Sequence, residues 1–190
     1  MTQQENLPQR RKLPHLIPSW VGQGARHFIT INCHERGVDR LCTGNVATEL
    51  LSSARHYEEI GHWYLWLMVV MPDHAHLIAT FDLDHGLDAT VKSWKGYQKR
   101  MLHVKWQAGY FEHRLRNDDE FVEKMHYVRM NPVRKELVAS PDAWPHSLVR
   151  ADMAPGSVSI QGGEPFIRAA RQGRLALPGE EKRKVEVADV

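Results

Sequence analysis

The feature that most constrains the fold is a pair of apolar segments joined by a short turn. Residues 63–70 form a continuous apolar run, Met71-Pro72-Asp73 has the composition of a turn, and residues 74–81 form a second mostly apolar segment. Short apolar runs bounded by proline and aspartate are typical of paired strands. The sequence therefore predicts an antiparallel hairpin whose first strand is buried.

The segments on either side predict further strands and helices. A β-branched and aromatic stretch after Arg26 is typical of a strand, and Asn45 and Gly61 bracket a helical pattern as N-cap and stop. Asn117 with a glutamate three residues later predicts a helix start, and Pro132 predicts its end. The predicted elements are a strand at 27–33, a helix at 46–60, the hairpin strands at 63–70 and 74–81, a helix at 87–103, a strand at 109–116 and a helix from 118 to about 130.

This order of elements predicts an α+β fold. A ferredoxin-like split βαβ sandwich has an antiparallel sheet with helices on one face, and here an extra helix follows the last strand. We expect the other face of the sheet to be open and to receive a ligand.

The 190 residues suit one domain with two tails. Residues 1–24 are polar and proline-rich and contain Arg10, Arg11 and Lys12, which predicts a flexible basic arm. Residues 25–150 carry the predicted elements and form the expected catalytic domain. Residues 151–190 are rich in glycine and charge and are expected to form a flexible tail.

Bulk composition restricts the function classes. The formal net charge of +2 gives no overall basic field, so any nucleic-acid binding must depend on local charge. No apolar run approaches the roughly 20 residues that cross a bilayer, and the first 20 residues contain no apolar core resembling a signal peptide. With only two cysteines, we expect a cytoplasmic protein without membrane contact.

His74 and His76 lie two apart at the start of a predicted strand, so both imidazoles should point to one face, toward the open side. A catalytic cation needs a third protein donor, and Tyr127 and Asn131 share one face of the last predicted helix. Asn131 could coordinate the ion while Tyr127 attacks a phosphate. By spacing alone these residues also fit ordinary core and surface positions.

Four sequence blocks in a fixed order resemble a known family. Val69–Ile78 contains the HUH signature of two histidines flanking a hydrophobic residue, as in single-tyrosine transposases. The other blocks are similar to the series found in REP-associated tyrosine transposases, namely 109–117, 127–133 and Trp144-Pro145-His146-Ser147. Together the four blocks lie within residues 26–150.

The resemblance implies a bacterial, nucleoid-associated enzyme that cuts and rejoins single-stranded DNA at palindromic hairpins. It implies a transient 5′-phosphotyrosine on Tyr127 and a Mg²⁺ or Mn²⁺ ion held by His74, His76 and Asn131. Related transposases have glutamine as the third ligand. Both monomers and homodimers occur among such proteins, so the oligomeric state stays open.

Affinity for a hairpin requires cations along the DNA backbone. Aromatic residues between these cations, Trp94, Tyr97 and Trp106, are candidates for stacking on bases or for the core. The predicted DNA-binding residues are Arg10, Arg11, Lys95, Lys99, Arg100, Arg114 and Arg116.

Two other functions remain open at this point. One is a domesticated protein that binds DNA or RNA hairpins without cutting them. The other is a histidine-based phosphohydrolase, although that class favours a third alternating histidine, and Ile78 occupies the position.

Overall fold

The predicted hairpin forms the centre of a five-stranded antiparallel sheet. In the computed structural model, which describes residues 24–150, the strand order is β4-β1-β3-β2-β5. The elements are β1 (Arg26–Asn32), α1 (Val46–Glu59), β2 (Trp63–Met71), β3 (His74–Phe81), α2 (Leu87–Met101), β4 (Phe111–Leu115), α3 (Asp118–Arg129), α4 (Asn131–Arg134), the 3₁₀ turn η1 (Pro141–Ala143) and β5 (Ser147–Val149).

The α+β prediction is confirmed, and each predicted strand and helix is present to within two residues at either end. The arm and the tail predicted at 1–24 and 151–190, apart from Gly24, lie outside the described residues, as do Arg10 and Arg11.

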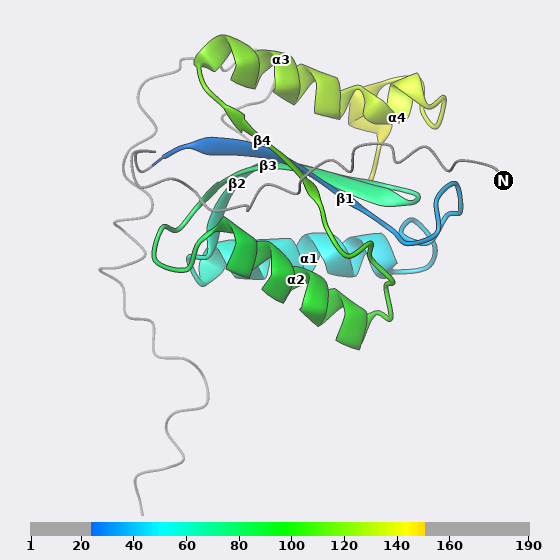
Figure 1. Cartoon of the computed structure of the whole chain (residues 1–190). Coiled ribbons are helices and arrows are strands. Elements are labelled where there is room, and N and C mark those ends of the chain that lie inside the picture. Colours follow the sequence, from blue (N-terminus) through cyan, green and yellow to red (C-terminus); the bar gives the residue numbers. More distant parts are fainter. Residues whose placement is uncertain (1–23, 151–190) are drawn as a thin grey trace, which may run out of the picture.

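Helices α1 and α2 cover one face of the sheet, and α3 and α4 lie on the other (Figure 1). Between the sheet and the first pair of helices is the larger apolar cluster, which includes Leu50, Leu77 and Trp94, all fully buried. Buried polar atoms beside this cluster form hydrogen bonds with one another, because Ser53 Oγ accepts from Trp94 Nε1 and Gln98 Nε2.

The second face of the sheet is not open, which corrects that part of the prediction. Phe121, Met125 and Val128 of α3 are buried against Phe28 and Ile78 of the sheet. The apolar stripe of a helix must be covered, and the uncovered strand face is the surface available to it. The extra helix therefore forms a third layer over this face of the sheet.

Two local details set the geometry of the sheet. The register of β2 against β3 shifts between Leu65 and Leu67, a β-bulge that puts Leu67 with the α3-side cluster while Leu65 stays with the other. At the far edge, Trp144 Nε1 donates to the Val70 carbonyl at 3.0 Å, just before β5 pairs with β2. The Trp144 block thus closes this edge of the sheet.

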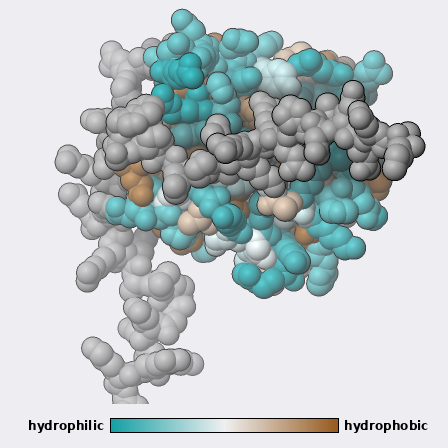
Figure 2. Space-filling view, viewed as in Figure 1, coloured by the Kyte–Doolittle hydropathy of each residue, from teal (hydrophilic) through white to brown (hydrophobic). Residues whose placement is uncertain are grey.

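The described surface seen in Figure 2 is mostly hydrophilic, with small separated apolar areas. Among residues 24–150, no helix has the length and apolar character needed to cross a membrane.

Candidate active site

The alternation of β3 turns its two histidines toward α3. Leu77 packs in the cluster under α1 and α2, whereas Ile78 packs in the cluster under α3. His74 and His76 share the face of Ile78 because successive side chains of a strand point to opposite faces. Their Nε2 atoms lie 3.1 Å apart, so the two imidazoles converge on one point.

The other ring nitrogen of each histidine has its own partner. His74 Nδ1 lies 2.5 Å from the carboxylate of Asp73, and His76 Nδ1 lies 2.9 Å from the Thr30 hydroxyl on β1. Donation to the carboxylate fixes the tautomer of His74 and leaves its Nε2 as a lone pair. Metal-ligating histidines typically have this kind of partner behind them.

Asp73 is itself held by the loop that follows β1. Its Oδ2 accepts from the Gly37 backbone N–H at 2.7 Å and lies 3.2 Å from Arg36 Nε. Gly37 has a φ of +75°, a conformation that glycine adopts without strain. Burial acts to raise the pKa of Asp73, but the bonds from Gly37 and His74 outweigh it and lower the pKa overall. Asp73 is therefore a fixed carboxylate.

Burial keeps both histidines neutral. It lowers the pKa of His76 to about 3, and electrostatic interactions with nearby His74, Arg36 and Lys124 lower it further. Burial also lowers the pKa of His74, against the opposing influence of Asp73. A neutral imidazole is the form that binds a metal ion.

Tyr127 lies beside this pair in the same chain. Its ring centroid is 6.4 Å from that of His76 and 6.4 Å from that of Phe28, in edge contacts. The side chain is 37% exposed, so the ring packs on the sheet while solvent still reaches the residue. Of the predicted set, the structure brings His74, His76 and Tyr127 together.

Cations surround the tyrosine. Lys124 Nζ lies 4.9 Å from the centre of the Tyr127 ring, and the Arg134 guanidinium lies 5.1 Å from it. Arg36 and Lys135 add their charges near His74, where they act to lower its pKa. The site is thus locally positive in a chain of nearly balanced charge, which suits an anionic ligand.

Asn131 occupies a break between two helices. It is the first residue of α4 rather than part of α3, and its Nδ2 donates to the Tyr127 carbonyl at 2.9 Å. Pro132 has no N–H to offer the carbonyl four residues earlier, and Asn131 Nδ2 lies 3.5 Å from that Val128 oxygen. Because the amide nitrogen is used in this way, the oxygen Oδ1 is the atom of Asn131 left for a cation.

The donor set fits a divalent ion in part. Within residues 24–150, no three His, Cys, Asp or Glu side chains gather as a metal site, so a third protein donor would be of another type, such as the amide of Asn131. Two neutral imidazoles with Nε2 atoms 3.1 Å apart match ligands at adjacent positions around an ion about 2.1 Å away. The two histidines therefore supply two adjacent donors of a cation site, and the third donor and the identity of the metal stay predictions.

The predicted DNA-binding residues that lie within residues 24–150 do not share this site. Lys99 and Arg100 are exposed on α2, across the sheet from the histidines (Figure 1). Arg114 pairs with His27, whose neighbour Phe28 faces α3, so Arg114 points to the α2 side. Arg116 is exposed in the connection from β4 to α3.

Lys95 has a structural position. It is 9% exposed, and its Nζ lies 2.8 Å from the Gln107 carbonyl and 2.9 Å from that of Gly109. The ammonium thus anchors the segment between α2 and β4, which leaves little of it for a phosphate.

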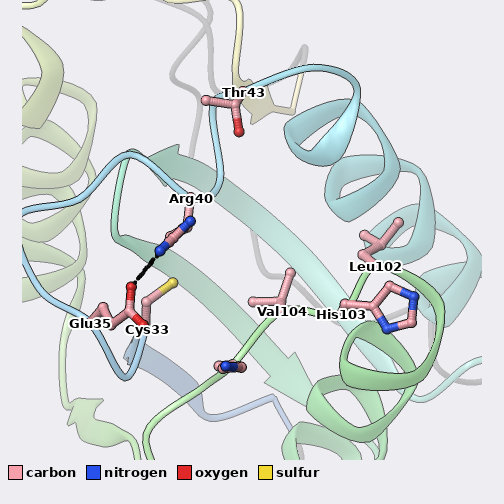
Figure 3. A pocket seen from close by; sticks show the side chains of 8 residues that line it. Cys33, Glu35, Arg40, Thr43, Leu102, His103 and Val104 are labelled. Carbon is pink, nitrogen blue, oxygen red and sulfur yellow. Dashed lines mark hydrogen bonds and ion pairs between the residues drawn. The ribbon is translucent and has the colours of Figure 1, made fainter.

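A pocket of about 320 Å³ lies away from the histidines, between the loop after β1 and the segment after α2 (Figure 3). An ion pair between Glu35 and Arg40 stands at one side of it, and Cys33, His103 and Val104 also line it. Burial raises the pKa of Cys33 to about 11, so its thiol is a poor nucleophile near neutral pH.

Sequence reasoning missed several residues of the site. Asp73 precedes His74 directly, and an adjacent carboxylate was a signal that could have been used. Helical spacing does place Lys124 on the same helix face as Tyr127, although it gives the lysine no role. Thr30 and Phe28 join the site only through the pairing of β1 with β3, which spacing within one segment does not give.

A family model described as IS200-like transposase matches residues 22–129, more than half of the chain. The chain belongs to the IS200-like transposase family. The matched range includes His74, His76 and Tyr127 and ends just before Asn131.

This IS200-like transposase is also similar to two known proteins. The REP-associated tyrosine transposase of Escherichia coli strain K12 is 29% identical over 147 residues, which cover 73% of this chain and 84% of the relative. The solved structure of a REP-associated tyrosine transposase bound to a REP hairpin has a TM-score of 0.64 at 23% identity. It covers 84% of this chain and 93% of that chain. At this identity the structural likeness supports the fold.

Proposed function

We propose that this transposase is a metal-dependent endonuclease and strand transferase for single-stranded DNA, with Tyr127 as its nucleophile. The observation that carries the proposal is the convergence of His74 and His76 beside Tyr127 of the same chain. One chain then holds the two histidines and the tyrosine together, so catalysis would not require a second copy to supply the tyrosine.

In the proposed reaction, the Tyr127 oxygen attacks a backbone phosphorus. The new bond joins Tyr127 to the 5′ phosphate, the bond from phosphorus to the 3′ oxygen breaks, and that oxygen gains a proton while the phenol loses one to water. Attack by the 3′-hydroxyl of another strand reverses these changes and rejoins the DNA.

The surrounding residues have distinct parts in this proposal. A bound Mg²⁺ or Mn²⁺, held by His74, His76 and Asn131, would withdraw charge from the phosphoryl oxygens. Asp73 and Thr30 orient the two imidazoles. Lys124 and Arg134 offset the negative charge of the phosphate beside the tyrosine.

The proposed substrate is DNA with a palindromic hairpin, because both compared relatives are REP-associated tyrosine transposases and one was solved on a REP hairpin. Inverted repeats in the DNA around the gene would supply the sequence. The exposed Arg116, Lys99 and Arg100 are proposed as contacts to more distant parts of such DNA.

The test is a covalent-adduct assay. Labelled single-stranded hairpin DNA is incubated with the full chain and Mn²⁺, and the protein is separated under denaturing conditions. We expect a labelled protein band that requires Mn²⁺ and is lost in Tyr127→Phe and in His76→Ala.

Tyr110→Phe is the matched control for the loss of a phenol. Tyr110 donates to Asp88 at 3.1 Å on the other side of the sheet, so the variant should keep the adduct. A band that survives Tyr127→Phe would remove Tyr127 as nucleophile. Tight metal-independent binding without any adduct would favour the non-cleaving hairpin-binding protein.

A further inference from the structure

Phe111 is an exposed aromatic residue at the edge of the sheet, on the face of the active site. It begins β4, which is an edge strand, and it is 54% exposed. Its cross-strand partner on β1 is Thr30, which in turn pairs with His76 on β3. Residues paired directly across strands point to the same face, so Phe111 lies about 10 Å from His76, two interstrand spacings away.

A series of ring contacts links Phe111 to the nucleophile. The Phe111 and Phe28 ring centroids are 5.9 Å apart, and Phe28 in turn contacts Tyr127 and stacks on His76 at 5.6 Å. One side of Phe111 is thus supported by the aromatic cluster while the rest faces solvent.

Lys124 lies over the same cluster. Its Nζ is 5.0 Å from the centre of the Phe28 ring and 4.9 Å from that of Tyr127. In the part of the chain that the structure describes, the ion pairs of the neighbouring α3 residues involve Asp118, Glu120 and Arg129, and none includes Lys124. Lys124 is therefore a cation beside Tyr127, on the same aromatic cluster that Phe111 contacts through Phe28, and it is available to an incoming anion.

We propose that Phe111 and Lys124 form a subsite for one nucleotide next to the phosphate that Tyr127 attacks. The base stacks on Phe111 and the phosphate of that nucleotide contacts Lys124. Single-stranded nucleic acids are held by this combination of aromatic platforms and cations. The proposal rests on the proposed function, since it places the nucleotide relative to Tyr127.

The subsite contributes affinity for unpaired DNA without reading a particular base. Stacking tolerates every base because each has a π face. An unpaired nucleotide fits Phe111 better than a paired one, because a paired base already stacks on its neighbours. The structure thus assigns to this edge the single-stranded DNA that flanks a hairpin rather than the hairpin stem.

The test measures binding rather than cleavage. In a Tyr127→Phe background, fluorescence anisotropy follows a hairpin DNA probe with single-stranded arms, its sequence taken from inverted repeats around the gene. Phe111→Ala should weaken binding by about 5- to 150-fold, the usual range for loss of one stacked base, and Phe111→Trp should retain it.

Abasic substitutions along the arms then locate the contact. At one position, the abasic probe should bind the parent protein as weakly as the intact probe binds Phe111→Ala. The abasic probe and Phe111→Ala together should then lose no more affinity than either change alone. A neutral methylphosphonate in place of the phosphate beside that position should weaken binding to the parent protein. With this probe, Lys124→Gln should cause no further loss of affinity. If the losses of affinity from the protein change and the probe change multiply at every position, the proposed subsite is wrong.

Two control variants separate a specific effect from a general one. Leu83→Ala removes another exposed apolar side chain, and Arg55→Gln removes a charge from exposed α1 surface; both should leave binding unchanged. If Phe111→Ala instead changes only the oligomeric state, the edge is a protein interface and the proposal is wrong.

The outcomes also separate this subsite from the proposed function. If the coupled binding effects are seen but no adduct ever forms, the subsite is supported and the proposed nuclease activity is wrong. If Phe111→Ala forms the adduct at limiting DNA as well as the unsubstituted protein does, the nuclease activity is supported and the subsite is wrong.

Discussion

The two faces of the central sheet differ in what their side chains do. Under α1 and α2, twenty buried apolar residues of the range 24–150 form one cluster, and Ser53 accepts hydrogen bonds from Trp94 and Gln98 of α2. Under α3, a smaller apolar cluster borders two buried histidines and several cations. The first face supplies most of the apolar burial, and the second holds the candidate chemistry.

Strand β3 makes this division possible within a few residues. Leu77 points toward α1 and α2, whereas its neighbour His76 points toward α3. The rigid cluster on one side fixes the backbone from which the histidines project on the other. Adjacent positions in this strand should therefore respond to mutation in opposite ways, one mainly in stability and the other mainly in activity.

The largest expected effect on stability is at Leu77. Leu77→Ala should lower the free energy of unfolding by about 2–5 kcal/mol, since it leaves a cavity in a closely packed cluster. His76→Ala should cost about 1 kcal/mol, because it removes one hydrogen bond, to Thr30, along with a polar group that is costly to bury. Urea unfolding followed by tryptophan fluorescence measures both values.

For activity, we expect His76→Ala to have the larger effect and Leu77→Ala the smaller one. The folded fraction of Leu77→Ala should keep the DNA adduct, and His76→Ala should lose it. Equal losses of stability in the two variants would break the comparison between the faces.

A smaller effect is expected at Asp73, which acts on the second face only through His74. Asp73→Asn should weaken Mn²⁺ binding by about 10- to 100-fold, the usual result of losing the carboxylate behind a ligating histidine. Isothermal titration calorimetry with Mn²⁺ alone measures it. Asp82→Asn, just past the other end of β3, is the control and should bind Mn²⁺ like the parent. Unchanged affinity in Asp73→Asn would show that His74 does not depend on this carboxylate.

The fold could be predicted from sequence because its signals are local. The apolar run at 63–70, the Met71-Pro72-Asp73 turn and the Asn117 cap each act within a few residues. Coverage of the second face was missed for a different reason. It depends on how α3 folds back over β1 and β3, a contact between segments distant in sequence.

The candidate site divides in the same way. The shared face of His74 and His76 follows from strand alternation, and the sequence alone predicts it. The distance from Tyr127 to His76 depends on the packing of Phe28 against both, which requires the pairing of β1 with β3. Lys95 illustrates the limit for surface residues, because its position in a helix gave no indication of the three carbonyls it lies near.

The N-terminal cap of α3 on one face of the sheet differs from that of α1 on the other, and this difference should have the smallest effect on stability. Asn117 Oδ1 accepts from the Glu120 N–H at 2.8 Å, and Glu120 Oε2 accepts from the Arg116 N–H at 2.7 Å. The glutamate thus reaches one residue further back than in a standard capping box. Asn45, at the start of α1, makes no such side-chain bond.

Asn117→Ala should therefore lower the free energy of unfolding by about 1 kcal/mol, and Asn45→Ala should change it by only a few tenths. Because α3 carries Tyr127 and packs mainly through Phe121, Met125 and Val128, fraying at its start should leave the tyrosine in place. We expect Asn117→Ala to form the DNA adduct at the parent rate below its melting temperature. A reduced rate there would mean that the cap, as well as the packing of α3, positions the nucleophile.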